Sequence, residues 1–412
     1  MPVFLLRSRL KWVGLGLLVF VVNTVALYAV FTSRGQFIIW DIHPTLVAGQ
    51  AVWQGQDPYS AEVTATIQRQ VYGGRLARPT EDTMIFAYPP YVAYLAIPLA
   101  LLPRAWAQAA WLSLLEAAIV AGTSMSSATW GWPRSRLASG VMFAFCLFFY
   151  PVVWGFILGQ ITLILFVLLA LAVWAASQRR DGLAGVALGL TIVKPQLVCL
   201  IAPGMVIWAV ARRRWRLVAG AFVVVALLIA ASWSLQPQWI ASVLKRLAKG
   251  DPYQGFAAPT QVVLDRCCAS VSGWLEPLLA CAVLGAVVYS WWVAARRGRE
   301  ADFLWAVGVT LIATTAILPQ VSIVSQVILL LPILGAVKLL VSQGRWGRLV
   351  AIGVLILWGA GLWLLSWLPP VLTAQPRYPV EHRVLSPVLP FTLGLIWLIG
   401  RSALVRDRGG QP

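Results

Sequence analysis

The sequence predicts an all-α polytopic membrane protein, a bundle of about 12 transmembrane helices with short amphipathic helices in its first outer loop. Two observations support this fold class. Hydrophobic residues form 60% of the 412 residues and charged residues only 11%, whereas charged residues form about a quarter of a soluble domain. Apolar runs also recur along almost the whole chain, with basic residues clustered between them, which is typical of repeated membrane crossings.

The apolar runs give the expected membrane spans. They lie roughly at 12–31, 104–122, 137–153, 157–177, 182–193, 196–211, 216–235, 277–295, 301–318, 323–341, 348–367 and 388–401. The first run follows basic residues but lacks a small-residue cleavage site, so we interpret it as a retained helix and not as a signal peptide. The run 89–102 contains Pro98 and has about half the usual spanning length. It either crosses the membrane or is re-entrant.

The net charge of +18 is explained by topology. Basic clusters occupy the short segments between spans, at Arg134/Arg136, Arg179/Arg180, Arg212–Arg214 with Arg216, Arg296/Arg297/Arg299, Arg345/Arg348 and Arg401/Arg406/Arg408. Because cytoplasmic loops are enriched in Lys and Arg, these segments and both chain ends, 1–11 and 402–412, are expected in the cytoplasm. The outer loops are then 32–88, 236–276 and a shorter one at about 368–387. The whole chain, 1–412, is expected to form one integral-membrane domain in the cell membrane. We expect contacts with membrane lipids and no nucleic-acid binding.

Metal and cofactor chemistry are not indicated. The five cysteines do not show the spacing of a zinc site. The two histidines, His43 and His382, lie in outer loops without other candidate ligands, and we interpret both as surface polar residues. No glycine-rich phosphate loop follows a predicted strand. Neither a metal nor a cofactor is therefore expected.

The first outer loop begins with an acid ahead of a predicted helix. Ile42, Leu46, Gly49 and Trp53 recur at helical spacing, which predicts a short amphipathic helix along the membrane surface with Pro44 in its first turn. Asp41 lies just ahead of this helix, where the first span emerges. A carboxylate that is partly desolvated there gains basicity. Asp41 is thus either a functional group or an ordinary interfacial acid, and we favour the first.

A second acid in this loop has a different interpretation. Asp57 precedes Pro58, and Glu62 follows, which predicts a helix with Asp57 as its N-cap. At the end of the loop, Tyr88 stands before a Pro-Pro pair that returns the chain to the membrane. Tyr88 suits the aromatic belt at the interface.

Polar residues also occur at the ends of predicted spans. Gln160 follows Gly159 at the start of a span, and its amide needs a partner, either a sugar hydroxyl or another helix. Lys194 precedes Pro195 where the apolar stretch 182–211 is broken. A cation is costly there unless it is paired, and its partner is either a phosphate or Glu116. We favour the phosphate, which the amide groups at the start of the helix 196–211 would also bind.

The second outer loop offers further candidates. Lys245, Arg246 and Lys249 fall on nearby helical positions and suit lipid head groups. Thr260, Gln261 and Arg266 are candidates for lining a cavity instead.

A series of short motifs resembles glycosyltransferase family 87. The motifs are Asp41 after the first span, Gly55-Gln56-Asp57-Pro58-Tyr59, Tyr88-Pro89-Pro90, the run from Pro98 to Pro103, Gly159-Gln160, the run from Ala184 to Pro195, and Arg213–Arg216. The resemblance covers about 30–220 well and the rest loosely. Family members often carry a histidine in an outer turn after a proline, where this chain has Pro319-Gln320. This departure increases the importance of Lys194.

The resemblance implies an integral-membrane enzyme with a GT-C-like bundle. It would be an inverting glycosyltransferase that moves mannose, or another hexose or pentose, from a polyprenyl-phosphate donor to a lipid-linked or envelope glycan acceptor at the outer face. Asp41 would be the general base, and Lys194 would face the leaving phosphate. We expect the substrate-binding residues to be Asp57, Tyr59, Tyr88, Gln160, Lys194, Gln196, Gln261, Arg266 and Gln320.

Two other functions are compatible with the sequence. A lipid-sugar flippase or small-solute transporter would also have many spans, but transport sites usually lie near the bilayer midplane, where this chain has little beyond Glu116. A non-catalytic partner in an envelope complex is the other alternative. The acids of the long outer loop favour the enzyme.

Overall fold

The computed structural model describes residues 3–33, 38–79, 81–133, 135–242, 257–319, 321–373 and 384–409. Helices make up 81% of the structure, and the described residues contain no strand. Among the described residues, seven helices are long and apolar enough to cross a membrane, and the bent pair α6–α7 would make an eighth span. Five further apolar helices are shorter. The predicted all-α polytopic membrane fold is confirmed.

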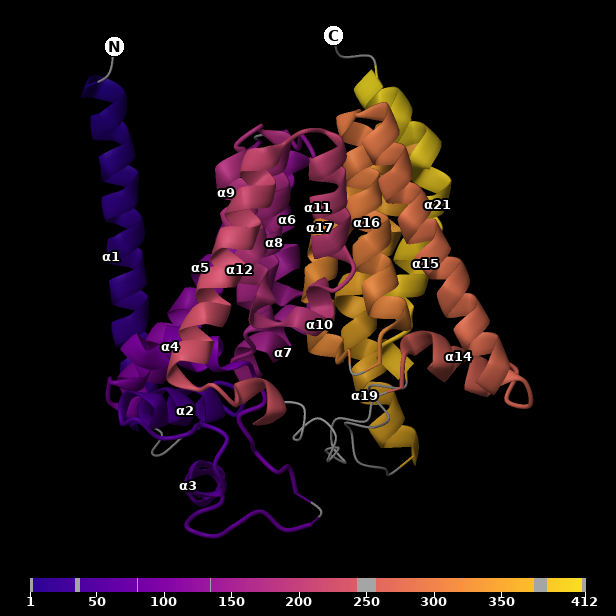
Figure 1. The fold of residues 1–412 in the computed structure, drawn as a ribbon. Helices are drawn as coiled ribbons and strands as arrows, with labels where there is room; N and C mark the ends of the chain where they lie inside the picture. The colour runs from indigo at the N-terminus through magenta and orange to yellow at the C-terminus, as the bar shows by residue number, and fades with distance from the viewer. Residues whose placement is uncertain are drawn as a thin grey trace. The chain divides into compact units, whose positions relative to one another are not determined.

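The helices follow the predicted apolar runs (Figure 1). In chain order they are α1 (Val3–Ser33), α2 (His43–Trp53), α3 (Ala61–Val71), α4 (Pro90–Ala100), α5 (Arg104–Thr129), α6 (Arg136–Phe148), α7 (Tyr150–Leu158), α8 (Thr162–Ser177), α9 (Asp181–Leu190), η1 (Thr191–Val193), α10 (Pro195–Val198), α11 (Ile201–Ala211), α12 (Trp215–Leu235), α14 (Pro259–Cys267), α15 (Ser272–Arg297), α16 (Glu300–Ile317), η2 (Ile323–Leu329), α17 (Leu330–Ser342), α18 (Gly344–Ile356), η3 (Leu357–Gly361), α19 (Leu362–Thr373) and α21 (Val388–Gly409).

The chain forms two compact units. Unit 1 consists of Met1–Ala118, Phe156–Ile161 and Ala231–Lys249. Unit 2 consists of Ile119–Gly155, Thr162–Ala230 and Gly250–Pro412.

In unit 1, α2, α3 and α4 gather at the C-terminal end of α1 (Figure 1). Polar contacts join α1 to α5: Asn23 Nδ2 donates to Glu116 Oε2 at 2.6 Å and to Ser113 Oγ at 3.0 Å. The rings of Tyr28 and Trp106 stack with their centroids 4.0 Å apart. Because a buried amide or carboxyl is costly without a partner, these contacts fix how α1 packs on α5. They also give Glu116, the alternative partner for Lys194, a partner within unit 1.

Helix α2 differs from its prediction. It begins at His43 with Pro44 in its first turn, as expected. An amphipathic helix would bury one face only, whereas most residues of α2 are buried. Gly49 allows α4 to approach closely, since a Cβ there would lie 3.0 Å from Ala100 Cβ and 3.2 Å from the Ala93 carbonyl oxygen. Trp53, predicted on the apolar face, is 65% exposed.

The N-cap prediction for Asp57 is wrong. Helix α3 begins at Ala61, and the side chain of Ser60 accepts the Val63 N–H at 3.2 Å as its N-cap. Asp57 instead accepts the N–H of Tyr59, two residues ahead, at 2.9 Å. Such a local turn competes with helix formation, so the helix starts at the next residue able to cap it.

The core of unit 2 lies along α16 and the η2–α17 segment, which are buried on almost all sides. Helices α15 and α21 pack on α16, and α8 packs on η2. Tryptophans fill the space above glycines: Trp130 lies on Gly335, Trp291 on Gly204 and Trp397 on Gly308. The Trp130 Nε1–H donates to the Leu331 carbonyl at 2.8 Å, so the indole is both packed and hydrogen-bonded.

Prolines explain where predicted spans are interrupted. The stretch 196–211 is not one helix but α10 and α11, because Pro203 cannot bond the carbonyl of Cys199 and its ring crowds that group. The amide groups invoked for an anion at the start of this stretch therefore belong to a single short turn. Pro332 similarly separates η2 from α17, and Pro151 lies just after the 53° bend between α6 and α7.

Candidate active site

The predicted base, Asp41, is held by residues distant in sequence. It lies in the turn before α2, and its Oδ2 accepts a hydrogen bond from Gln160 Nε2. The Asp41 N–H donates to the Leu158 carbonyl at 2.9 Å. All three residues belong to unit 1. Because an ionised carboxylate only accepts hydrogen bonds, the Gln160 amide orients it with one oxygen engaged.

Gly159 determines the position of Gln160. Its φ of +69° lies in the left-handed region, and a Cβ there would stand 2.4 Å from Ile39 Cγ2. The Trp111 Nε1–H donates to the Gly159 carbonyl at 2.8 Å. Only glycine can both adopt this left-handed backbone and leave room for the Ile39 side chain. The predicted span 157–177 accordingly begins later, at Thr162, after this turn.

We expect Gly159→Ala to destabilise the protein by about 1–3 kcal/mol, since the added methyl is strained by the backbone and collides with Ile39. The matched control is Gly73→Ala, where φ is +66° and a Cβ meets open space. Thermal unfolding in detergent should show a larger loss for Gly159→Ala. Equal losses would mean that the close approach to Ile39 contributes nothing.

Two α5 residues that the sequence did not single out support this turn. Gln108 is 2% exposed, and its Oε1 accepts the Ile39 N–H at 2.6 Å. Trp111, one turn further, binds Gly159 as described above. The sequence offered one signal for this pair. Gln108 is an amide inside the predicted span 104–122, and Trp111 follows it by three residues, which places both side chains on the same face of the helix.

Tyr88 lies near Asp41. Burial raises the pKa of the Tyr88 phenol well above its usual range, and the negative charge of Asp41 adds to this. The backbone carbonyl of Tyr88 accepts the Tyr59 hydroxyl at 2.7 Å. Asp57 continues the chain of contacts, accepting the Tyr59 N–H and, at 3.2 Å, Gln236 Nε2. The structure thus brings together, within unit 1, five of the predicted residues: Asp41, Asp57, Tyr59, Tyr88 and Gln160.

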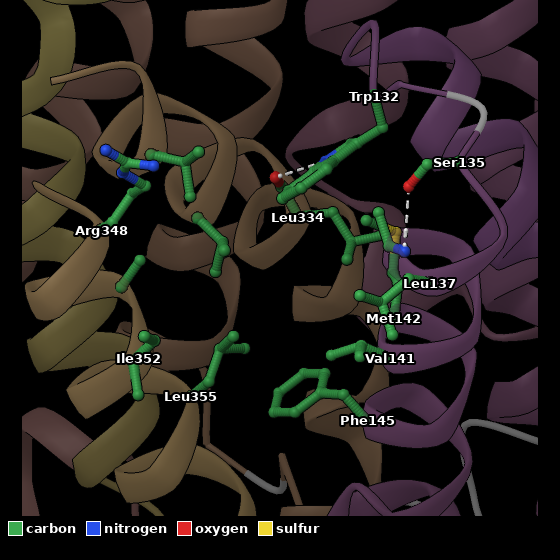
Figure 2. A pocket seen from close by; sticks show the side chains of 14 residues that line it. Trp132, Ser135, Leu137, Val141, Met142, Phe145, Leu334, Arg348, Ile352 and Leu355 are labelled. Carbon is green, nitrogen blue, oxygen red and sulfur yellow. Dashed lines mark hydrogen bonds between the residues drawn. The ribbon is translucent and has the colours of Figure 1, made fainter. Parts of the chain in front are cut away.

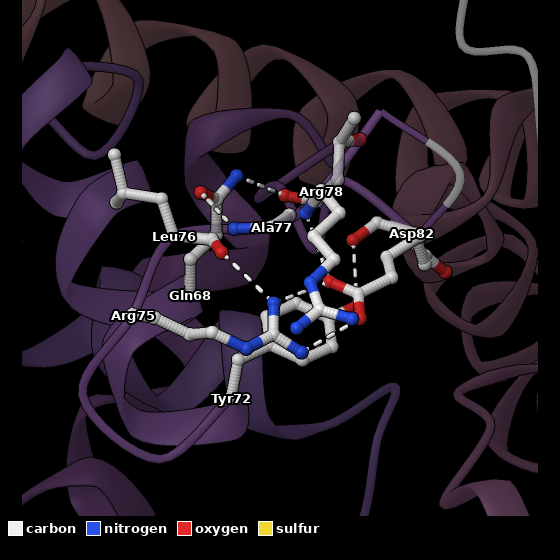
Figure 3. A network of polar contacts seen from close by, with 9 residues as sticks. Gln68, Tyr72, Arg75, Leu76, Ala77, Arg78 and Asp82 are labelled. Carbon is white, nitrogen blue, oxygen red and sulfur yellow. Dashed lines mark hydrogen bonds and ion pairs between the residues drawn. The ribbon is translucent and has the colours of Figure 1, made fainter.

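The segment between α3 and Tyr88 is held by a polar network that includes Gln68 of α3 (Figure 3). Arg75 forms a bidentate pair with Glu81, with both N–O distances 2.6 Å, and lies over the Tyr72 ring. This pairing lowers the pKa of Glu81 to about 2. The Tyr72 hydroxyl donates to the Asp82 carbonyl at 2.7 Å, and Gln68 donates to the Thr83 carbonyl at 2.7 Å. These contacts hold the segment after α3 within unit 1.

The prediction that His43 is a surface residue is wrong. Its side chain is 2% exposed, because α2 is packed inside unit 1. Burial, and next the positive charge of Arg104, lower its pKa from 6.5 to about 4, although a hydrogen bond with Gln70 opposes this. His43 is therefore neutral near pH 7. His382 lies outside the described residues.

This burial predicts a pH-dependent stability. The folded state binds fewer protons at His43 than the unfolded state, so the stabilisation is complete above about pH 6.5 and is lost as the pH falls towards 4. The loss should be on the order of 3 kcal/mol. Thermal unfolding of wild type and His43→Phe between pH 7 and pH 4 checks this, since the variant should show a shallower decline. Equal slopes would exclude His43 as the source.

The other predicted residues belong to unit 2. Lys194 is 8% exposed, lies between η1 and α10, and donates from Nζ to Thr162 Oγ1 at 2.8 Å. Thr162 is a second partner that the sequence did not identify. Thr162 follows Gln160 by two positions in the sequence and is the first residue of α8. Gln196 is exposed.

On α14, Gln261 and Arg266 are exposed, whereas Thr260 is buried with its Oγ1 3.5 Å from Glu276 Oε1. Gln320 lies outside the described residues, as do Lys245, Arg246 and Lys249. Within the described ranges, no three His, Cys, Asp or Glu side chains gather as metal ligands would.

Comparison with known proteins identifies the family. The model of glycosyltransferase family 87 matches residues 86–320, more than half of the chain. Comparison with curated proteins gives no match. The matched region includes Tyr88, Gln160 and Lys194, while Asp41 and Asp57 precede it, so the case for Asp41 depends on its contacts with the matched region. By this match, the chain belongs to glycosyltransferase family 87.

Proposed function

We propose that this glycosyltransferase moves a sugar from a polyprenyl phosphate to a lipid-linked or envelope glycan acceptor at the outer face of the cell membrane. The observation that carries the proposal is the Asp41–Gln160 hydrogen bond, with Tyr88 nearby. It supplies an oriented carboxylate in the segment where the first predicted span meets water. A donor with an isoprenoid tail is dissolved in the bilayer and offers its sugar at that level.

The reaction is a single displacement. Asp41 accepts the proton of an acceptor hydroxyl while that oxygen attacks the anomeric carbon. The bond from this carbon to the phosphate oxygen breaks, and its electron pair leaves with the lipid phosphate. Attack from the opposite face inverts the anomeric configuration. Gln160 keeps the carboxylate directed, and Tyr88 lies close enough to sense its charge.

Lys194 is proposed to stabilise the charge that develops on the leaving phosphate. Its ammonium is buried at the break between η1 and α10 and donates a hydrogen bond to the Thr162 hydroxyl, which fixes its position. Donors held ready for developing charge in a dry environment contribute strongly to catalysis. Gln196, Gln261, Arg266 and Gln320 remain candidates for binding the sugar or the acceptor.

The experiment is a transfer assay in proteoliposomes. The purified protein is incubated with a panel of radiolabelled polyprenyl-phosphate hexoses and pentoses and with a lipid extract as acceptor. We expect one sugar to appear in a glycosidic product, which also identifies the donor. Labelled sugar that crosses the bilayer without forming any such product would contradict the proposal and favour a flippase or transporter.

A further inference from the structure

A cavity in unit 2 is lined by none of the predicted site residues. It has a volume of about 510 Å³ and is lined by α6, α17, α18 and the turn before α6. Ligand pockets in proteins fall in this size range. Its described lining residues are Trp132, Ser135, Leu137, Ala138, Val141, Met142, Phe145, Leu334, Val337, Val341, Arg348, Ala351, Ile352 and Leu355.

The cavity has one basic end and one apolar end. Figure 2 shows Arg348 and Trp132 at one end and Phe145 and Leu355 towards the other. Of the described lining residues, Arg348 is the only charged one. The Lys338 ammonium lies 5.9 Å from the centre of the Trp132 ring, which adds a second cation near this end. The loops at this end carry the basic clusters predicted to be cytoplasmic.

The polar groups at the basic end leave the guanidinium available for a ligand. The Trp132 Nε1–H donates to the Leu334 carbonyl at 3.1 Å, and Ser135 Oγ accepts the Ala138 N–H at 3.1 Å. Among the residues that the structure describes, no carboxylate lies within ion-pair distance of Arg348. The positive charge at the cavity mouth therefore lacks an acidic partner in this part of the chain, which suits an anionic ligand.

The cavity wall is continuous with a strongly apolar outer surface. Leu137 is 80% exposed, and Val141 and Ile352 are each 54% exposed. In a chain that spans a membrane, such side chains face hydrocarbon. A lipid chain can thus enter the cavity sideways from the bilayer, without passing through water.

We propose that this cavity binds one anionic phospholipid from the leaflet that the basic loops face. One acyl chain lies along Phe145 and Leu355, and the phosphate meets Arg348. The apolar walls alone do not distinguish one phospholipid from another, because all lipid tails are about as apolar as leucine. Selectivity comes from the charge at the mouth, as for basic pockets between transmembrane helices that bind anionic head groups.

The test uses native mass spectrometry of protein released from phosphatidylcholine nanodiscs that contain a minor fraction of phosphatidylglycerol. Wild type should retain one phosphatidylglycerol in preference to phosphatidylcholine. Arg348→Gln should lower this retention about fivefold, the effect of roughly one basic residue near a membrane surface. The matched control is Arg345→Gln, which removes an exposed arginine of the same helix, α18, that does not line the cavity. This control should retain the lipid.

A second pair of variants tests the cavity itself. Ala138→Trp should fill it and abolish retention, whereas Gly140→Trp, on the same helix but with open space around it, should not. Thermal unfolding confirms that each variant is folded, and Ala138→Leu replaces Ala138→Trp if the larger side chain unfolds the protein. Equal retention by Arg348→Gln and Arg345→Gln, or retention after the cavity is filled, would overturn the proposal.

Discussion

Replacing Asp41 with asparagine should lower the rate of sugar transfer by about 10²–10⁴-fold, the range that a positioned general base contributes. Asparagine is close in shape to aspartate, and its carbonyl oxygen can still accept the Gln160 amide. It cannot take a proton from the acceptor. The variant should therefore fold and bind the donor as wild type does but turn it over far more slowly. Turnover and equilibrium donor binding, measured on the same preparation, separate the two effects.

The matched control for Asp41→Asn is Glu62→Gln. Glu62 is an exposed acid in the first turn of α3, which like Asp41 belongs to unit 1. Its neutralisation removes one negative charge without touching the hydrogen bonds given above for Asp41. It should leave turnover unchanged. Wild-type turnover in Asp41→Asn, or equal losses in both variants, would exclude Asp41 as the base.

Replacing Lys194 with methionine should lower transfer by about 10²–10³-fold, as expected when a preorganised donor to a developing negative charge is removed. Methionine has a similar length and no charge. Because the Lys194 side chain is buried and donates to Thr162, thermal unfolding of the variant and of wild type checks that the fold is retained. Turnover and donor affinity should both fall, since the phosphate is charged in the bound donor as well as in the leaving group.

Lys194→Arg distinguishes charge from shape. Arginine keeps the positive charge, so part of the lost activity should return, although its wider head group does not reproduce the contact of Nζ with Thr162. An unchanged donor affinity in Lys194→Met would contradict the phosphate role. So would a Lys194→Arg variant that is as inactive as Lys194→Met.

The sequence predicted the helices well because membrane spans are long apolar runs, and hydropathy alone identifies them. It misplaced interruptions whose cause is local. The start of α8 is set by the left-handed backbone of Gly159, and the division between α10 and α11 by Pro203. These effects act on one or two peptide groups and do not change the apolar pattern of the run.

The candidate site was predicted less completely. Asp41 was identified from its place ahead of a helix, but its contact with Gln160 joins residues 119 positions apart, and no local pattern predicts such a pairing. His43 was misplaced for a related reason. A short helix in an outer loop suggests a surface position, whereas tertiary packing of α2 against α4 buries it. Asp57 was predicted to be the N-cap of the next helix, but Ser60, three residues later, is the N-cap of α3.

The anomeric configuration of the product tests the central claim most directly, namely that sugar transfer is a single displacement with Asp41 as the base. Once the donor panel has identified the sugar, nuclear magnetic resonance of the isolated product gives the configuration at the new glycosidic bond. We predict inversion relative to the polyprenyl-phosphate donor. Retention would require two displacements through a covalent intermediate, and it would contradict a mechanism in which Asp41 only accepts the proton of the acceptor.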